Sequence, residues 1–274
     1  MSTATRNQQP PSIWDTRAAA AAPRALSAEE ARALTDDGYV VLRKLVGMDL
    51  VDAALTAINA SLGNGVPREE LAGYRARSFT PELCSDPVLL NLLYESPLLS
   101  VAAGALGRGN LAGPEWAQVA LRFPSRANQS PAVPHIDGIA YPGNGVPAGT
   151  LQHFTALGAV FLSRSTTPDS GNFTVWPGSH RAVAAHFARH GAAGFTGGFP
   201  ALALGQSQPV MVEPGDAVLA HYMLSHGIAP NTSPYIRYGI FFRLQHRGHA
   251  ALGDRPLRAP WLEWEGLPPG LRTT

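Results

Sequence analysis

Three side chains in this sequence have the types needed to hold a transition-metal ion together. His135 and Asp137 are separated by one residue, and His226 follows about 90 residues later. Two imidazoles and one carboxylate are the ligand set of a facial triad, which holds iron(II) on one side and leaves other positions open for reactants. We therefore expect His135, Asp137 and His226 to bind iron(II), with O2 reacting at the open positions.

A plainer interpretation of the same residues has to be weighed against this one. A His-x-Asp pair is short enough to occur often by chance, so His135 and Asp137 could form a surface ion pair while His226 lies in a turn. Residues two apart in a strand point to the same face, and we expect that arrangement for His135 and Asp137. His221 competes for the place of third ligand, but we expect it rather to line the pocket.

An arginine follows the last candidate ligand. Arg237 lies eleven residues after His226 and opens a strand-like run that extends to Phe242. A guanidinium binds a carboxylate through two parallel hydrogen bonds, with more geometric specificity than an ammonium. Arg237 is therefore the candidate for the distal carboxylate of a dicarboxylate cosubstrate, with Arg122 and Arg243 as alternatives. The plainer interpretation is a solvated arginine on a strand.

The elements that must position these residues begin with helices. Ser27 and Glu30 have the spacing of a capping box, and Gly38 is a natural helix end. Pro87 follows Asp86 where a helix can begin without loss of a hydrogen bond, and Pro97 interrupts that helix. The expected elements are helices over 27–38, 49–62 and 86–107 and a strand over 39–42.

From Trp116 onward, short β-rich runs alternate with clusters of Gly, Pro, Asn and Asp. This pattern predicts a mainly β protein, a double-stranded β-helix of the jelly-roll or cupin type with flanking N-terminal helices. We expect a flexible tail over 1–25 and one domain over 26–274, divided into a helical flank (26–110), a jelly-roll core (115–247) and a C-terminal extension (248–274) that packs as irregular structure. The expected strands are 116–123, 155–162, 172–176, 209–212, 217–221 and 235–244.

Composition limits the class of protein. The 274 residues carry a net charge of +1, which does not favour nucleic acid as a partner. No apolar run has the length of a transmembrane helix, and the N-terminus lacks the features of a signal peptide. The single cysteine, Cys84, excludes an internal disulfide and fits a buried residue in a reducing compartment. We expect a cytoplasmic protein that acts on a small molecule and not on a membrane; the oligomeric state stays open.

Several segments resemble the phytanoyl-CoA dioxygenase-like family of oxygenases. His135-Ile136-Asp137 resembles the family's His-x-Asp motif, and Pro177-Gly178-Ser179-His180 resembles its conserved turn between the two ligand stretches. The similarity spans roughly residues 26–245. The other segments that resemble the family are 33–42, 170–176 and 213–216, and His226-Gly227 followed by Arg237.

The resemblance implies a double-stranded β-helix that uses Fe(II), 2-oxoglutarate and O2. It makes His135, Asp137 and His226 the metal ligands and Arg237 the cosubstrate-binding residue. His180 is not a ligand in the family, and we expect it to brace the turn.

The sequence departs from the family pattern at two places. A serine that often follows the distal histidine by two residues is Ile228 here, and an aromatic residue common on the strand before Gly171 is Val160. Because both departures affect cosubstrate contacts, we expect Gln118 or Thr155 to supply substitutes.

The reaction class follows from the same resemblance. Halogenating relatives have Gly or Ala where this chain has the Asp137 carboxylate, so hydroxylation or a related oxidation is expected, with release of succinate and CO2.

The Gly- and Pro-rich segment 138–149 is a candidate lid over the active site, although an inert loop would have the same composition. The sequence lacks a cluster of basic residues that would bind the phosphates of a CoA thioester. A small metabolite or natural-product intermediate is therefore the expected substrate. Candidate substrate contacts are Tyr141, Gln152, His153, Trp176 and His221.

Two other functions compete with an oxygenase. A non-catalytic cupin-like protein would bind a metal or ligand without turnover. A cupin-type isomerase or hydrolase would use Zn or Mn and would have no need of Arg237. The complete set of three ligands and Arg237 favours the oxygenase.

Overall fold

The computed structural model describes residues 24–125 and 130–272. Its strands are β1 (Tyr39–Leu42), β2 (Leu111–Ala112), β3 (Gln118–Arg122), β4 (Ala156–Phe161), β5 (Phe173–Val175), β6 (Gln208–Pro209), β7 (Ala217–His221), β8 (His226–Ile228) and β9 (Arg237–His246). Its α-helices are α2 (Ala28–Asp37), α3 (Met48–Gly63), α4 (Leu71–Ala76), α5 (Pro87–Tyr94), α6 (Pro97–Leu106), α7 (Ser179–His190), α8 (His249–Leu252) and α9 (Arg255–Arg258).

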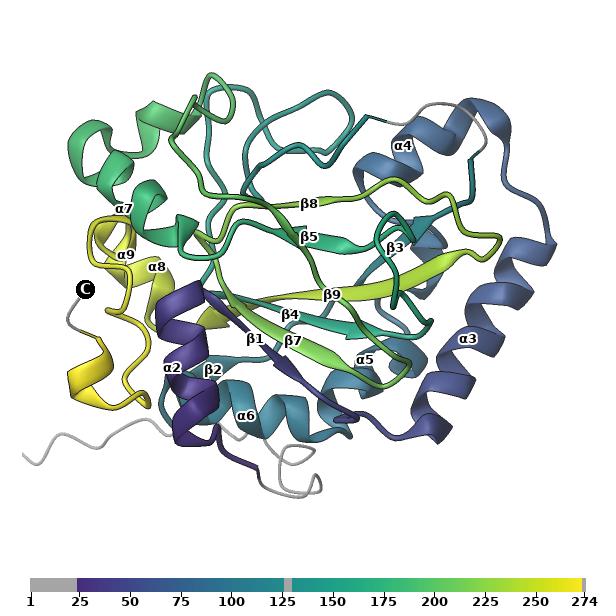
Figure 1. Cartoon of the computed structure of the whole chain (residues 1–274), viewed down its shortest axis with the longest axis horizontal. Coiled ribbons are helices and arrows are strands. Elements are labelled where there is room, and N and C mark those ends of the chain that lie inside the picture. The colour runs from purple at the N-terminus through teal and green to yellow at the C-terminus, as the bar shows by residue number, and fades with distance from the viewer. Residues whose placement is uncertain (1–23, 126–129, 273–274) are drawn as a thin grey trace, which may run out of the picture.

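The strands form two antiparallel sheets that pack face to face (Figure 1). In the larger sheet the order is β1-β7-β4-β9-β2, and β3 also pairs with β9. In the smaller sheet the order is β6-β5-β8. The predicted double-stranded β-helix with flanking N-terminal helices is confirmed.

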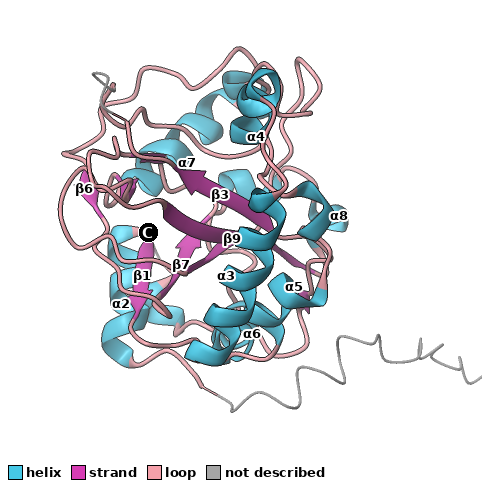
Figure 2. Cartoon of the chain, turned by 90° about the vertical axis from the view of Figure 1, so that its right-hand side faces the viewer, coloured by secondary structure: helices cyan, strands magenta, loops and turns pink. Residues whose placement is uncertain are grey.

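Alternation along the strands creates two hydrophobic cores. On β9, Phe241 faces the smaller sheet and packs with Phe161 and Phe173, whereas Phe242 faces the opposite way. The outer face of the larger sheet is covered by α3, α5 and α6, which lie along it in Figure 2. The inner core between the sheets therefore lies next to the segments that carry the candidate ligands.

Local sequence signals set the helix boundaries. Ser27 and Glu30 form both bonds of the predicted capping box, and Gly38 ends α2 with φ of 84°. Asp86 accepts a hydrogen bond from the Val88 amide at the start of α5. No single helix within the described ranges is long and apolar enough to cross a membrane; α5 and α6 meet that length only jointly, across a 57° bend, and both are largely buried.

Three local expectations were wrong, and residues 1–23 of the tail predicted over 1–25 lie outside the described residues. His135 forms an isolated β-bridge and Asp137 lies in a turn, so the two do not share a strand. The expected strand over 209–212 is only Gln208–Pro209 (β6). The C-terminal extension, expected to be irregular, contains α8 and α9. Buried side chains such as Leu257 and Trp264 anchor it to the two cores.

Candidate metal centre

A reciprocal pair of backbone hydrogen bonds joins the two candidate histidines. The His135 amide donates to the His226 carbonyl at 3.0 Å, and the His226 amide donates to the His135 carbonyl at 2.9 Å. On its other side, β8 pairs with β5, where His226 lies opposite Val175. The bridge therefore brings two ligands that are far apart in the sequence onto neighbouring segments at the edge of the smaller sheet.

The three candidate ligand groups converge on one point. One ligand atom from each of His135, Asp137 and His226 lies within 4.8 Å of the others. The Nε2 atoms of His226 and His135 lie 3.6 and 3.9 Å from Asp137 Oδ1. The Nδ1 atoms approach the carbonyls of Leu224 (3.0 Å) and Val133 (3.3 Å).

This arrangement fixes the imidazole tautomers. A carbonyl oxygen only accepts, so Nδ1 carries a proton in both rings, and each Nε2 atom is directed toward the carboxylate. Metal-ligating histidines are oriented in this way, with the outer nitrogen donating to a carbonyl or carboxylate. The donor set therefore fits a divalent metal such as iron(II).

The protonation states suit a metal as well. Burial and the neighbouring His226 lower the pKa of His135 to about 4, so its ring is neutral at pH 7. For Asp137, burial by itself would raise the pKa, but the Arg243 guanidinium and then His226 hold it well below its usual range. The group at neutral pH is thus one carboxylate with a neutral imidazole beside it, which are the forms that bind metal.

Asp137 is held in place by neighbours. Arg243 Nη2 donates to Asp137 Oδ2 at 2.8 Å and to Gln118 Oε1 at 3.0 Å. The Tyr222 hydroxyl donates to the Asp137 carbonyl at 3.2 Å. These contacts occupy one carboxylate oxygen and leave Oδ1 facing the histidines. Gln118, one of two residues expected at the cosubstrate, accepts this hydrogen bond from Arg243.

Two glycines allow the chain to pack this tightly. Gly138 has φ of 82°, and a Cβ there would lie 2.0 Å from the Gln152 carbonyl oxygen. A Cβ on Gly227 would lie 2.6 Å from the carbonyl oxygen of Val133. The glycines next to Asp137 and His226 therefore let the chain pass close to the backbones of Gln152 and Val133.

Arg237 is a buried cation on the side of β9 that faces the smaller sheet. Its Nε donates to the Gly171 carbonyl at 2.8 Å and its Nη1 to the Ala120 carbonyl at 3.0 Å. Burial, followed by the nearby Arg122, lowers its pKa to about 9, so it remains charged at pH 7. Within the described ranges, its Nη2 has no hydrogen-bond partner and no carboxylate pairs with it.

A cavity of about 610 Å³ opens beside Asp137, and Tyr141 and His153 line it as predicted substrate contacts would. Tyr141 donates from its hydroxyl to the Ala76 carbonyl at 3.1 Å. The His153 ring packs 4.6 Å from that of His249. The remaining lining residues are Arg77, Trp116, Gly138, Asn144, Gly145, Val146, Gln152, Phe154, Arg243 and Gln245, together with Ala76.

Three other predicted residues lie outside the lining of that cavity. The Thr155 hydroxyl donates to Glu263 at 2.8 Å, in a buried network supplied by the C-terminal extension. His221 donates from Nε2 to the Pro260 carbonyl at 2.8 Å and stacks on Trp264. Trp176 is buried at the end of β5.

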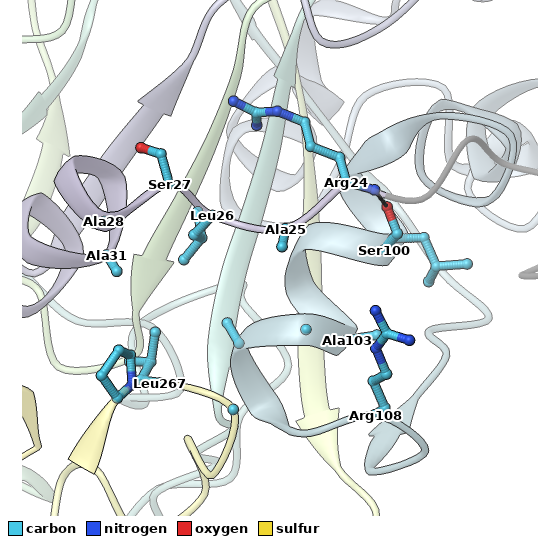
Figure 3. A pocket seen from close by; sticks show the side chains of 15 residues that line it. Arg24, Ala25, Leu26, Ser27, Ala28, Ala31, Ser100, Ala103, Arg108 and Leu267 are labelled. Atoms are coloured by element: carbon cyan, nitrogen blue, oxygen red, sulfur yellow. Dashed lines mark hydrogen bonds between the residues drawn. The ribbon is translucent and has the colours of Figure 1, made fainter.

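Other cavities surround the centre at different distances. One of about 600 Å³ is lined by His135, Ile228, Arg75 and Arg122, so the ligands lie between it and the cavity at Asp137. Another, of about 780 Å³, lies between the start of α2 and α6, where the Arg24 amide donates to the Ser100 hydroxyl (Figure 3). None of the predicted site residues lines the latter.

The chain was compared with protein families and with curated proteins. The family model for phytanoyl-CoA dioxygenase (PhyH) matches residues 34–239. No curated protein matches the chain.

Solved structures resemble this chain at low sequence identity, so this likeness concerns the fold. EctD from S. alaskensis in its apo form is 21% identical with a TM-score of 0.55, covering 81% of this chain and 77% of that chain. HygX from Streptomyces hygroscopicus with nickel and 2-oxoglutarate bound is 21% identical with a TM-score of 0.54, covering 81% and 88%. The non-heme alpha-ketoglutarate-dependent carbocyclase SnoK from nogalamycin biosynthesis is 21% identical with a TM-score of 0.52, covering 80% and 85%.

The family match extends over most of the chain and includes all three converging ligands and Arg237. It confirms the predicted family and, with it, the predicted enzyme class and cofactors, Fe(II) and 2-oxoglutarate. The chain belongs to the phytanoyl-CoA dioxygenase family of Fe(II)- and 2-oxoglutarate-dependent oxygenases.

Proposed function

We propose that this protein oxidises a C–H bond of a small organic molecule, by hydroxylation in the simplest case, with release of succinate and CO2. The observation that carries the proposal is the convergence of two histidine Nε2 atoms on one oxygen of Asp137. Each histidine is held in the metal-binding tautomer by a backbone carbonyl.

Each ligand has a defined task at this centre. His135, Asp137 and His226 would hold iron(II) through three positions, and the others remain for cosubstrate and O2. Iron(II) bound with 2-oxoglutarate and O2 supplies the oxidising power, and the protein supplies positions and excludes water. Because Asp137 provides a carboxylate ligand, the proposal favours hydroxylation over halogenation.

Arg237 is the proposed partner of the distal cosubstrate carboxylate. It is a charged guanidinium only 2% exposed, and no carboxylate pairs with it within the described ranges. A buried cation without a counter-ion is costly, so an anionic cosubstrate would stabilise this arrangement. Arg243 is less suited to this task, because it is bonded to the ligand Asp137 and lies too near for the far end of a five-carbon diacid.

Conversion of 2-oxoglutarate to succinate tests the proposal. The purified protein with Fe(II), ascorbate and O2 is expected to form succinate, and Asp137→Ala is expected to form none. Arg164→Lys, a conservative change of an exposed arginine paired with Glu213, serves as the matched control. Tight metal binding without any succinate would contradict the proposal and favour a cupin-like binding protein.

A further inference from the structure

The cavity beside Asp137 has an unbalanced set of charged side chains. Its charged lining residues are Arg77, Arg243 and Asp137. Burial and the neighbouring His249 lower the pKa of His153, so this residue adds no charge at pH 7. A divalent metal and the dianion of 2-oxoglutarate cancel in formal charge, so one positive charge of the lining remains uncompensated.

Arg243 is held rigidly at this cavity. Nη2 uses both of its hydrogens, on Asp137 and on Gln118. The guanidinium carbon lies 5.8 Å from the ring centroid of Trp116 and 6.0 Å from that of Phe154. Four contacts from three segments therefore fix the plane of the guanidinium before any ligand arrives, which lowers the ordering cost of binding.

The remaining donors of Arg243 are available to a ligand. In the parts of the chain that the structure describes, its Nε and Nη1 have no hydrogen-bond partner, and its side chain is 33% exposed. Arg243 lines the same cavity as the rings of Trp116 and Phe154, so an anion bonded to Arg243 would have its apolar part against one of these rings.

Arg77 adds a second cation at the rim of the same cavity. Its Nε donates to the Gly143 carbonyl at 2.8 Å, and its own carbonyl accepts from Gln118 Nε2 at 2.6 Å. These bonds connect the loop over 138–149 to the strand that carries Gln118. The loop would thus cover a ligand held between Arg77 and Arg243.

We propose that this cavity binds the substrate and that the substrate is an organic acid whose carboxylate is bound by Arg243. The inference rests on the proposed oxygenase function and adds the class of its substrate. Arg237 and Arg243 lie on the same face of β9, six residues apart, and so divide the work: one binds the cosubstrate carboxylate and the other the substrate carboxylate. The apolar body of the acid lies against Trp116 and Phe154, with the C–H bond to be oxidised toward Asp137.

A matched pair of probes tests this inference. Protein loaded with Co(II) and saturating 2-oxoglutarate is titrated calorimetrically with phenylacetate and with phenylacetamide, which have nearly the same shape but differ in charge. Phenylacetate is expected to bind at least tenfold more tightly. Arg243→Gln is expected to abolish the preference, Arg243→Lys to retain part of it, and Arg164→Gln to leave it unchanged.

Several results would overturn the inference. Equal affinities for the acid and the amide, including no binding of either, would show that charge does not select the ligand. Loss of phenylacetate affinity as 2-oxoglutarate is raised would place the acid in the cosubstrate site. Failure of the wild-type protein to load Co(II) and 2-oxoglutarate would instead refute the proposed function, so the two failures are distinguishable.

Discussion

Replacement of Arg237 by lysine separates the binding role of the guanidinium from its charge. Lysine keeps the positive charge but cannot present two parallel donors to a carboxylate. In the structure Nε and Nη1 are engaged by Gly171 and Ala120, which directs the Nη2 side toward a ligand. Arg237→Lys is therefore expected to bind 2-oxoglutarate more weakly, while the metal ligands stay intact.

The size of the effect follows from the hydrogen bonds lost. One hydrogen bond to a charged group contributes about 1.5–3 kcal/mol, which corresponds to roughly a 10- to 150-fold increase in the Kd for 2-oxoglutarate. The Gly171 carbonyl also loses its donor, which lowers the free energy of unfolding by about 1–3 kcal/mol. Both changes occur at one buried residue, and they have to be measured separately.

Calorimetric titration of 2-oxoglutarate into Co(II)-loaded protein gives the affinity, and urea denaturation gives the stability. Arg164→Lys is the control, because the Arg164 side chain is 72% exposed and pairs only at the surface with Glu213. A Kd within twofold of wild type, together with a lower free energy of unfolding, would refute the assignment. Arg237 would then be a structural residue, and another group would hold the cosubstrate.

Three further predictions concern the metal ligands, the close backbone packing at Gly138 and the buried histidines. Asp137→Ala is expected to weaken metal binding by more than roughly 100-fold, measured by competition with a chelator, since loss of outer contacts alone costs about 10- to 100-fold; an unchanged affinity would exclude Asp137 as a ligand. Gly138→Ala would place a Cβ 2.0 Å from the Gln152 carbonyl oxygen, so succinate formation is expected to fall about 100-fold, as for a misplacement of about 1 Å; full activity would contradict the crowding. Burial lowers the pKa of His180 to about 3 and that of His221 to about 4, so the unfolded chain binds more protons below pH 6.5. The free energy of unfolding is therefore expected to decrease as pH falls from 6.5 toward 4, by up to about 1.4 kcal/mol per pH unit for each histidine. Denaturation of the metal-free protein at pH 7 and pH 5 measures this decrease. The same decrease in His221→Gln as in the wild type would contradict the prediction.

Short-range signals predicted most of the architecture. The capping box at Ser27 and the glycine end at Gly38 are local chemistry, and the structure contains both. The short apolar runs over 217–221 and 156–161 likewise mark β7 and β4, which are buried at every position. The ligand residues could be proposed because His-x-Asp, a distant histidine and an arginine are uncommon in this order.

The site contacts that were missed depend on strand register and on the C-terminal extension. Arg243 reaches Asp137 only because the turn at Gly138 places that carboxylate over β9, and no local pattern encodes this pairing. Thr155 is drawn away from the cavity by Glu263, more than 100 residues later, in a segment expected to be irregular. The alternation Arg237, Gly239, Phe241, Arg243 was the available signal, since it places both arginines on one face of β9.

Anaerobic titration of the purified protein with Fe(II) and 2-oxoglutarate tests the central claim most directly. Chelation of the keto acid at a facial-triad iron is expected to produce a weak visible charge-transfer band, on the order of 500 nm, that saturates at one iron per chain. The band is expected to be absent in Asp137→Ala. A folded wild-type protein that binds iron but produces no band on addition of 2-oxoglutarate would contradict the account.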